Sequence, residues 1–436
     1  MTRARRDGLY LMLLGSLMFL FFPGVTLNYL SSDFKGLYYP ARCLIQHGDP
    51  YSKSDVLPIY QGDKANHPLD PENVRLVATQ YVYQPTALFF TVPFAMLPWG
   101  SAHLLWMGLI YGSLIFASFL VWNLGTDYAP IVSGVLIGFL LANSELLVVT
   151  GNAAGIAISL CVVGVWCFLR ERFVFAGILC FALSLTLKPH DTGLVWLYFL
   201  LAGGVYRKRA LQTLVTTAAL SLPVVLWVWQ VSPHWIQELS STLSAYSVHG
   251  GLNDPGPAST GAHNLGMMLN LQTIISFFRD DPSVYNPVSY LICGLLLLVW
   301  IFVVVRSRPS PKSAWLALAA IATLTLLPVY HRQSDTKLLL LTVPACTMLW
   351  AEGGRIGRLA LLVTSAGFVL TGDMLWIFFF GILGNLHLHP TRLVGEVLIA
   401  VQVFPVPLIL LVMSVFYLWV YVRSCGAGLD EECLPR

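Results

Sequence analysis

The sequence predicts an all-α polytopic membrane protein, from its composition and from the lengths of its apolar runs. Hydrophobic residues make up 56% of the 436 residues and charged residues only 11%, whereas soluble domains carry about 25% charged residues. A chain this poor in charge cannot cover a water-facing surface of its length. A soluble globular enzyme, a disordered chain and a nucleic-acid binder are therefore excluded.

About twelve apolar runs reach or approach the roughly 20 residues needed to cross a membrane. The first run follows Arg3, Arg5 and Arg6 and lacks a small-residue cleavage site, so we expect an uncleaved helix rather than a signal peptide. The run 87–98 is too short to span and predicts an interfacial or re-entrant helix. The predicted spans are 9–28, 102–122, 129–149, 152–169, 173–187, 192–206, 210–230, 287–305, 313–329, 338–351, 359–380 and 395–421.

The distribution of charge orients these spans. With a cytoplasmic N-terminus, alternation places 15 of the 25 basic residues in the short cytoplasmic loops and the two termini. All ten histidines and two large outer loops, residues 29–101 and 231–286, then fall on the other side. We expect residues 1–436 to form a single integral membrane domain with both termini cytoplasmic. Any chemistry should take place on the outer face.

Two polar residues near predicted span ends require an explanation. Asp33 follows the first span closely, where its carboxylate could act as a general base on a hydroxyl, or simply cap a helix or face solvent. Asn152 follows Gly151 at the outer end of the fourth span. It either lines a site or cross-links helices through hydrogen bonds.

Two charged turns also lie at the outer boundary. Lys188-Pro189-His190-Asp191 joins spans five and six, and its lysine could snorkel harmlessly or bind a lipid phosphate. The turn 330–337 carries His331, Arg332, Asp335 and Lys337 between two apolar runs. This composition favours anion binding over a plain solvated turn.

Other polar groups give weaker indications. Asp373 lies within a predicted span and could be functional or only pair with a neighbour. His387 and His389 form an HxH pair with no third ligand nearby in sequence, so we expect no metal. Asp33, Lys188 and His331 come from distant parts of the chain to one membrane boundary, which fits a pocket for an anionic lipid-linked donor beside a base.

In its ordered motifs the chain resembles glycosyltransferase family 87, enzymes of the GT-C type whose best-known members are mannosyltransferases that build lipid-linked mannosides. Each motif alone is weak, but the set follows the family's order along most of the chain. The matching segments are Asp33-Phe34 with Tyr38 and Ala41, Gly48-Asp49-Pro50-Tyr51, Tyr83-Gln84-Pro85-Thr86 with Leu97-Pro98-Trp99, Gly151-Asn152, Leu187-Lys188-Pro189, Trp235 with Tyr246, and Tyr330-His331-Arg332.

The resemblance implies a GT-C-like fold whose first outer loop is ordered and carries juxtamembrane helices. It implies an inverting hexosyl transfer, mannosyl in type by family analogy, from a polyprenyl-phosphate donor to a lipid or glycan acceptor, without cofactor or metal. Asp33 would be the base, and Lys188, His331 and Arg332 would bind the donor phosphate. The expected substrate cleft contains Tyr38, Tyr83, Asn152, His190, Asp191, Trp235, His263 and Asp335.

Departures from the family pattern concern the sugar and the acceptor more than the reaction type. Many members carry a second proline where Gln84-Pro85 stands, a glutamine at Asn152, and His-Asp or His-His-Tyr near His331-Arg332-Gln333. The main alternative function is a transporter or a flippase for lipid-linked sugars, and a second alternative is a non-catalytic membrane scaffold. A transporter or flippase needs polar residues along a path through the bilayer, whereas the charges here gather on one face.

Overall fold

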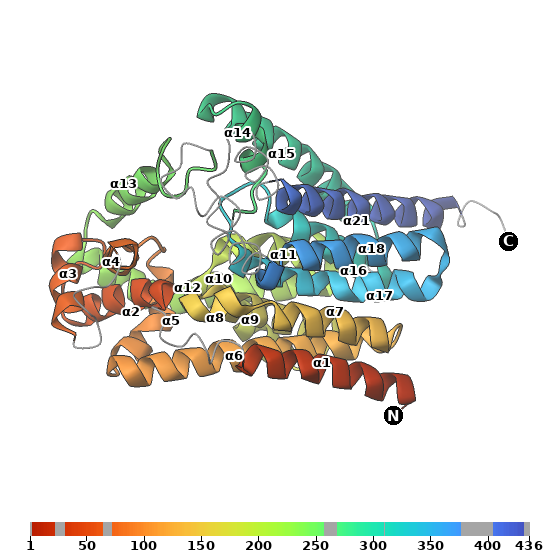
Figure 1. Ribbon diagram of the computed structural model, residues 1–436, viewed down its shortest axis with the longest axis horizontal. Helices are drawn as coiled ribbons and strands as arrows, with labels where there is room; N and C mark the ends of the chain where they lie inside the picture. Colours follow the sequence, from red (N-terminus) through yellow and green to blue (C-terminus); the bar gives the residue numbers. More distant parts are fainter. Residues whose placement is uncertain are drawn as a thin grey trace, which may run out of the picture.

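The computed structural model describes residues 2–21, 31–63, 72–256, 268–308, 310–375 and 404–430. Within these ranges the chain is helical, apart from loops and an isolated antiparallel bridge between Met268 and Arg332. Figure 1 shows long helices running side by side, with shorter helices gathered at one end. The start of α1 and the end of α21 both lie at the opposite end of these long helices (Figure 1).

Helices overlap all twelve predicted spans, and the all-helical multi-pass membrane class is confirmed. Four of the described helices are long and apolar enough to cross a membrane, namely α6, α12, α15 and residues 405–425 of α21. The count of twelve stays a prediction. The helices over the predicted spans are α1 (Arg3–Phe21), α6 (Trp99–Gly125), α7 (Pro130–Ala142), α8 (Glu145–Thr150), α9 (Ala154–Arg170), α10 (Val174–Leu187), α11 (Pro189–Leu201), α12 (Gly204–Val231), α15 (Pro282–Arg306), α16 (Pro311–Thr325), η3 (Gln333–Thr342), α17 (Val343–Glu352), α18 (Gly354–Leu370) and α21 (Pro405–Asp430).

The region predicted as one helix over 129–149 is broken between α7 and α8. The side chains of Asn143 and Ser144 donate hydrogen bonds to the carbonyls of Phe139 and Leu140. Lys337 Nζ donates to the carbonyl of Asn143 at 2.7 Å. The carbonyls of Phe139 and Leu140 also accept from the backbone N–H of Asn143. The carbonyl of Asn143 is satisfied by Lys337 instead of by the next helical turn, so the chain can turn there.

Glycines allow α1 and α7 to pack with their backbones in contact. A Cβ atom on Gly15 would lie 2.1 Å from the carbonyl oxygen of Gly138, and one on Gly134 would lie 2.1 Å from the carbonyl oxygen of Gly8. No side chain fits at either position. Helices in lipid lack a hydrophobic driving force for association, and small residues let their backbones approach closely enough to gain van der Waals contact instead.

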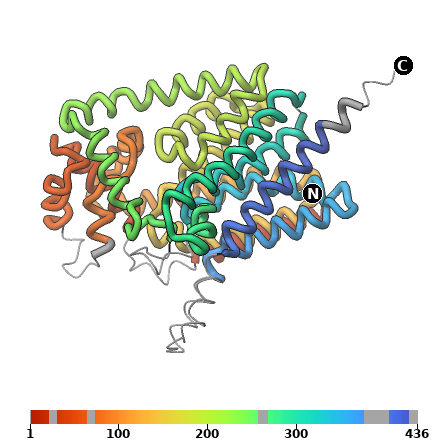
Figure 2. Tube along the Cα trace, turned by 90° about the horizontal axis from the view of Figure 1, so that it is seen from above, coloured from red at the N-terminus to blue at the C-terminus, as the bar shows by residue number. Residues whose placement is uncertain are grey.

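Shorter helices cover the end of the bundle away from the chain ends (Figure 1). In Figure 2 the same helices, coloured red, orange and green, again lie to one side of the long helices. The half-length helix predicted over 87–98 is present as α5, whereas its place at a membrane surface stays a prediction. These helices are α2 (Ser32–Ile45), α3 (Lys53–Gly62), α4 (Glu72–Thr79), α5 (Thr86–Ala95), α13 (Trp235–Ser247) and α14 (Gln272–Phe278).

An aromatic stack fixes α2 against α6. The ring of Phe34 lies 4.5 Å from Trp106 and 5.4 Å from Trp99, in stacked geometry on both. The indole of Trp106 donates a hydrogen bond of 2.9 Å to the carbonyl of Gly151. Because Phe34 and Gly151 directly adjoin Asp33 and Asn152 in the chain, the same contacts bring those two polar residues together.

Candidate functional site

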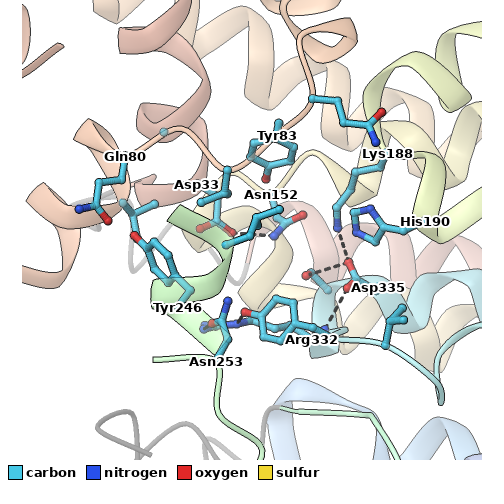
Figure 3. A pocket seen from close by; sticks show the side chains of 18 of the residues that line it. Asp33, Gln80, Tyr83, Asn152, Lys188, His190, Tyr246, Asn253, Arg332 and Asp335 are labelled. Carbon is cyan, nitrogen blue, oxygen red and sulfur yellow. Dashed lines mark hydrogen bonds and ion pairs between the residues drawn. The ribbon is translucent and has the colours of Figure 1, made fainter. Parts of the chain in front are cut away.

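A cavity of about 520 Å³ lies under α13, between the start of α2, the α8–α9 loop, the α10–α11 junction and the loop that precedes η3. Figure 3 shows polar side chains from these segments converging on it. Apolar side chains complete the wall, namely Val77, Val82, Leu187, Leu239, Leu243, Leu252 and Val329. The predicted site residues that line the cavity are Asp33, Tyr83, Asn152, Lys188, His190, Arg332 and Asp335.

Asn152 holds the carboxylate of Asp33. Its amide Nδ2 donates to Asp33 Oδ2 at 2.6 Å, while its Oδ1 accepts a hydrogen bond from the backbone N–H of Ala154 at 2.8 Å. The N–H of Ala154 can only donate, so it fixes which end of the amide faces Asp33. Gly151 makes this turn possible, because it adopts φ +65° and a Cβ there would lie 3.0 Å from Phe34 Cβ. Asn152 therefore positions the carboxylate as well as lining the cavity.

Lys188 lies between two carboxylates. Its Nζ is 2.6 Å from Asp335 Oδ1 and 3.1 Å from Asp191 Oδ2. The lysine ends α10, and Pro189 then starts α11, so the side chain projects from the junction. Burial opposes the charged form, but the two carboxylates outweigh it and raise the pKa of Lys188. The lysine stays charged, although much of that charge is already neutralised.

His331 lies behind the cavity wall rather than on it. The ring is completely buried, with Nδ1 3.0 Å from the carbonyl oxygen of Val329 and Nε2 3.5 Å from Asp191 Oδ1. A carbonyl only accepts, so Nδ1 carries a proton. Burial lowers the pKa of His331, but the neighbouring carboxylates of Asp191 and Asp335 outweigh it and the pKa is raised. A donor phosphate in the cavity would thus meet Lys188 or His190 before it met His331.

Arg332 is a cation of the cavity wall that is hydrogen-bonded to neutral groups, although Asp33 and Asp335 lie near enough to raise its pKa. Its guanidinium donates to the hydroxyl of Tyr330 and to Asn253 Oδ1, both neutral groups. Within the described parts of the chain, no carboxylate lies within ion-pair distance of it. Its backbone N–H is held by Asp335 Oδ2 at 2.9 Å, which fixes the start of η3. Arg332 is therefore better placed than Lys188 to gain from an incoming phosphate.

Other predicted cleft residues lie away from the cavity. The buried Tyr38 donates its hydroxyl proton to the carbonyl of Leu97, at 2.8 Å. Asp191 is completely buried beside Lys188, and Trp235 stacks on Tyr51 at 6.1 Å between ring centres. His263, like His387 and His389, lies outside the described residues.

The structure adds two residues that the sequence did not single out, since Gln80 and Asn253 line the cavity with amide groups. Tyr246, which belongs to one of the family motifs, adds an aromatic side chain from α13. Amides and aromatic faces are groups that commonly bind hydroxyl-rich ligands. Asp373 does not line the cavity. Its carboxylate accepts a hydrogen bond from the backbone N–H of Leu146 and so caps α8.

The fold and the site define an integral membrane protein that holds a carboxylate and cationic side chains around one cavity at the end of its helical bundle. The chain belongs to glycosyltransferase family 87, whose family model matches residues 81–328. It is therefore a membrane glycosyltransferase, as the ordered motifs predicted. The match includes Asn152 and Lys188, whereas Asp33 and the turn with His331, Arg332 and Asp335 lie outside it. Neither the curated proteins nor the solved structures that were compared gave a match.

Proposed function

We propose that the protein transfers a hexose, of mannosyl type, from a polyprenyl-phosphate carrier to a hydroxyl of a lipid or glycan acceptor in this cavity. The observation that carries the proposal is the arrangement of Asp33 in one cavity with Lys188 and Arg332. A glycosyl transfer needs a base for the acceptor hydroxyl and cations for the departing phosphate. The site would face the outer side of a bacterial plasma membrane.

The reaction is a single displacement. The acceptor oxygen attacks the anomeric carbon as Asp33 takes its proton, and the bond from that carbon to the phosphate oxygen breaks. The electron pair of this bond leaves with the polyprenyl phosphate. Attack opposite the leaving group inverts the anomeric configuration. Asn152 keeps Asp33 Oδ2 oriented, which leaves the other carboxylate oxygen for the acceptor.

Basic side chains stabilise the charge that develops on the phosphate. Arg332 supplies a guanidinium that forms no ion pair among the described residues, and Lys188 adds a charge that Asp335 and Asp191 hold in place. Fixed cations in a site of restricted solvent access need no reorganisation during the reaction. The proposed reaction therefore uses no cofactor and no metal in this cavity.

The test is Asp33→Asn in purified protein given a polyprenyl-phosphate-linked hexose and a hydroxyl acceptor. Loss of a general base slows transfer by about 10²–10⁴-fold. Asp49→Asn is the matched control. Asp49 follows α2, the helix that carries Asp33, but it lies outside the cavity and orders the turn before α3 by accepting a hydrogen bond from the backbone N–H of Tyr51. Transfer near the parent rate by the Asp33 variant would remove Asp33 from the role of base. Movement of a lipid-linked sugar across vesicles without any transfer would favour the flippase.

A further inference from the structure

A second cluster of ligand-type side chains lies outside the cavity, where the segment after α13 meets the start of α15. His249 Nδ1 lies 3.2 Å from Asp254 Oδ2 and 3.7 Å from Asp280 Oδ1. These three donor atoms all lie within 4.8 Å of one another. Donor atoms around a tetrahedral zinc ion are about 3.3–3.5 Å apart, given metal–ligand distances of about 2.0–2.2 Å.

The Asp280 carboxylate has an unsatisfied oxygen in this cluster. Its Oδ1 is shielded from solvent and accepts no hydrogen bond from the described residues. The atom is pressed against Gly256, where a Cβ would lie 2.1 Å from it. The Asp280 side chain is 27% exposed, but a shielded carboxylate oxygen without a hydrogen-bond donor is costly, and a cation bound there would remove this cost.

The Asp254 carboxylate is held rigidly toward the same point. It is completely buried, and it accepts hydrogen bonds from the backbone N–H groups of Gly250 and Gly256 and from the hydroxyl of Tyr285. Carboxylates that ligate metals are commonly oriented by such outer contacts. The His249 ring is half-exposed, which leaves a path for an ion and room for a water ligand.

The cluster differs from a second set of three ligand-type side chains, which lies beside the cavity. His190, Asp191 and His331 also lie close enough to share an ion, but there Lys188 Nζ lies 3.1 Å from Asp191 and already provides the positive charge. Among the described residues, no lysine or arginine forms an ion pair with Asp254 or Asp280. Of the two clusters, the one at Asp254 is therefore the one in need of a cation.

We propose that His249, Asp254 and Asp280 bind one divalent transition-metal ion of the zinc class. The mixed nitrogen and carboxylate donor set suits zinc better than calcium or magnesium, which prefer oxygen ligands alone. The ion joins the segment 249–256 to the start of α15. That segment carries Leu252 and Asn253, which line the cavity, so the metal braces one wall of the site without taking part in the transfer.

The experiment is a zinc titration of the full chain, purified in detergent without a histidine tag and stripped with a chelator. We expect one zinc per chain by elemental analysis and a nitrogen and oxygen ligand shell by X-ray absorption. His249→Gln and Asp280→Asn should abolish binding. Tyr285→Phe, which keeps the ligands but removes a hydrogen bond to Asp254, should weaken binding by about 10–100-fold.

His190→Gln is the matched control, since it removes a ligand-type side chain from the other cluster and should leave the zinc content unchanged. Hydrogen exchange gives a second readout, because zinc should slow exchange of residues 249–256 in the parent but not in Asp280→Asn. Absence of zinc binding by the parent would overturn the proposal, and His249 would then bridge the carboxylates through a proton. Loss of zinc in His190→Gln but not in His249→Gln would also overturn it.

Discussion

Replacement of Asn152 by aspartate changes the partner of Asp33 with very little change in shape. The new side chain still has an oxygen to accept the hydrogen bond from Ala154 N, so the cap of α9 is kept. The donor to Asp33 Oδ2 is lost, and a second carboxylate takes its place at 2.6 Å. Two carboxylates this close cannot both be ionised without a large cost.

The size of the effect follows from this contact. A hydrogen bond to a charged group contributes about 1.5–3 kcal/mol, which corresponds to about a 10- to 150-fold lower transfer rate where that energy orients the base. The acid limb of the pH–rate profile should also move to higher pH, because the added charge hinders ionisation of the base. Part of the activity should thus return at alkaline pH.

The assay is transfer from a polyprenyl-phosphate-linked hexose in detergent, measured between pH 5 and 9 for the parent and for Asn152→Asp. Asn152→Leu is the companion variant, since it removes the donor without adding charge and should lower the rate with no alkaline recovery. Its stability should fall by about 0.5–2 kcal/mol through loss of the cap. An Asn152→Asp variant with the parent rate and an unshifted profile would refute the positioning role.

Three further predictions concern stability. Lys188→Met should destabilise the protein by about 3–5 kcal/mol, since Asp335 keeps an uncompensated buried charge, and Asp335→Asn in the same chain should restore part of the loss in chemical unfolding. The pKa of His331 is raised in the folded protein, so the charged ring contributes to the free energy of unfolding. This contribution is complete below a pH of about 6.5, the ordinary histidine value, and is lost as the pH rises through the raised pKa. The difference in melting temperature between the parent and His331→Gln should therefore shrink from pH 6 to pH 9, and a constant difference would contradict this. Gly15→Ala should cost about 1–3 kcal/mol by overpacking, whereas Gly112→Ala, at an open position on α6, should be neutral or slightly stabilising.

The positions of the helices could be predicted from the sequence because apolar length is a local property. The charged turns at Lys188 and at Arg332 were found for a related reason, since charge is rare in this chain and stands out between apolar runs. The break at Asn143 could not be predicted. It depends on Lys337, nearly 200 residues away, whose ammonium binds the Asn143 carbonyl.

The roles of residues within the cavity could be predicted only in part from the sequence. The sequence brought Asp33, Lys188 and His331 to one boundary, but it could not show that His331 lies behind the wall or that two carboxylates flank Lys188. Such details depend on side-chain packing between distant segments. Asn253 lies in a turn-rich segment, and only its contact with Arg332 shows that it belongs to the cavity.

The most direct test of the central claim is a density map of the full chain with a polyprenyl-phosphate-linked hexose bound. The account predicts the phosphate in hydrogen-bond contact with Arg332 and near Lys188, and the anomeric carbon facing the space beside Asp33. A donor whose phosphate lies outside this cavity, or whose sugar is separated from Asp33 by the wall of α13, would contradict the account.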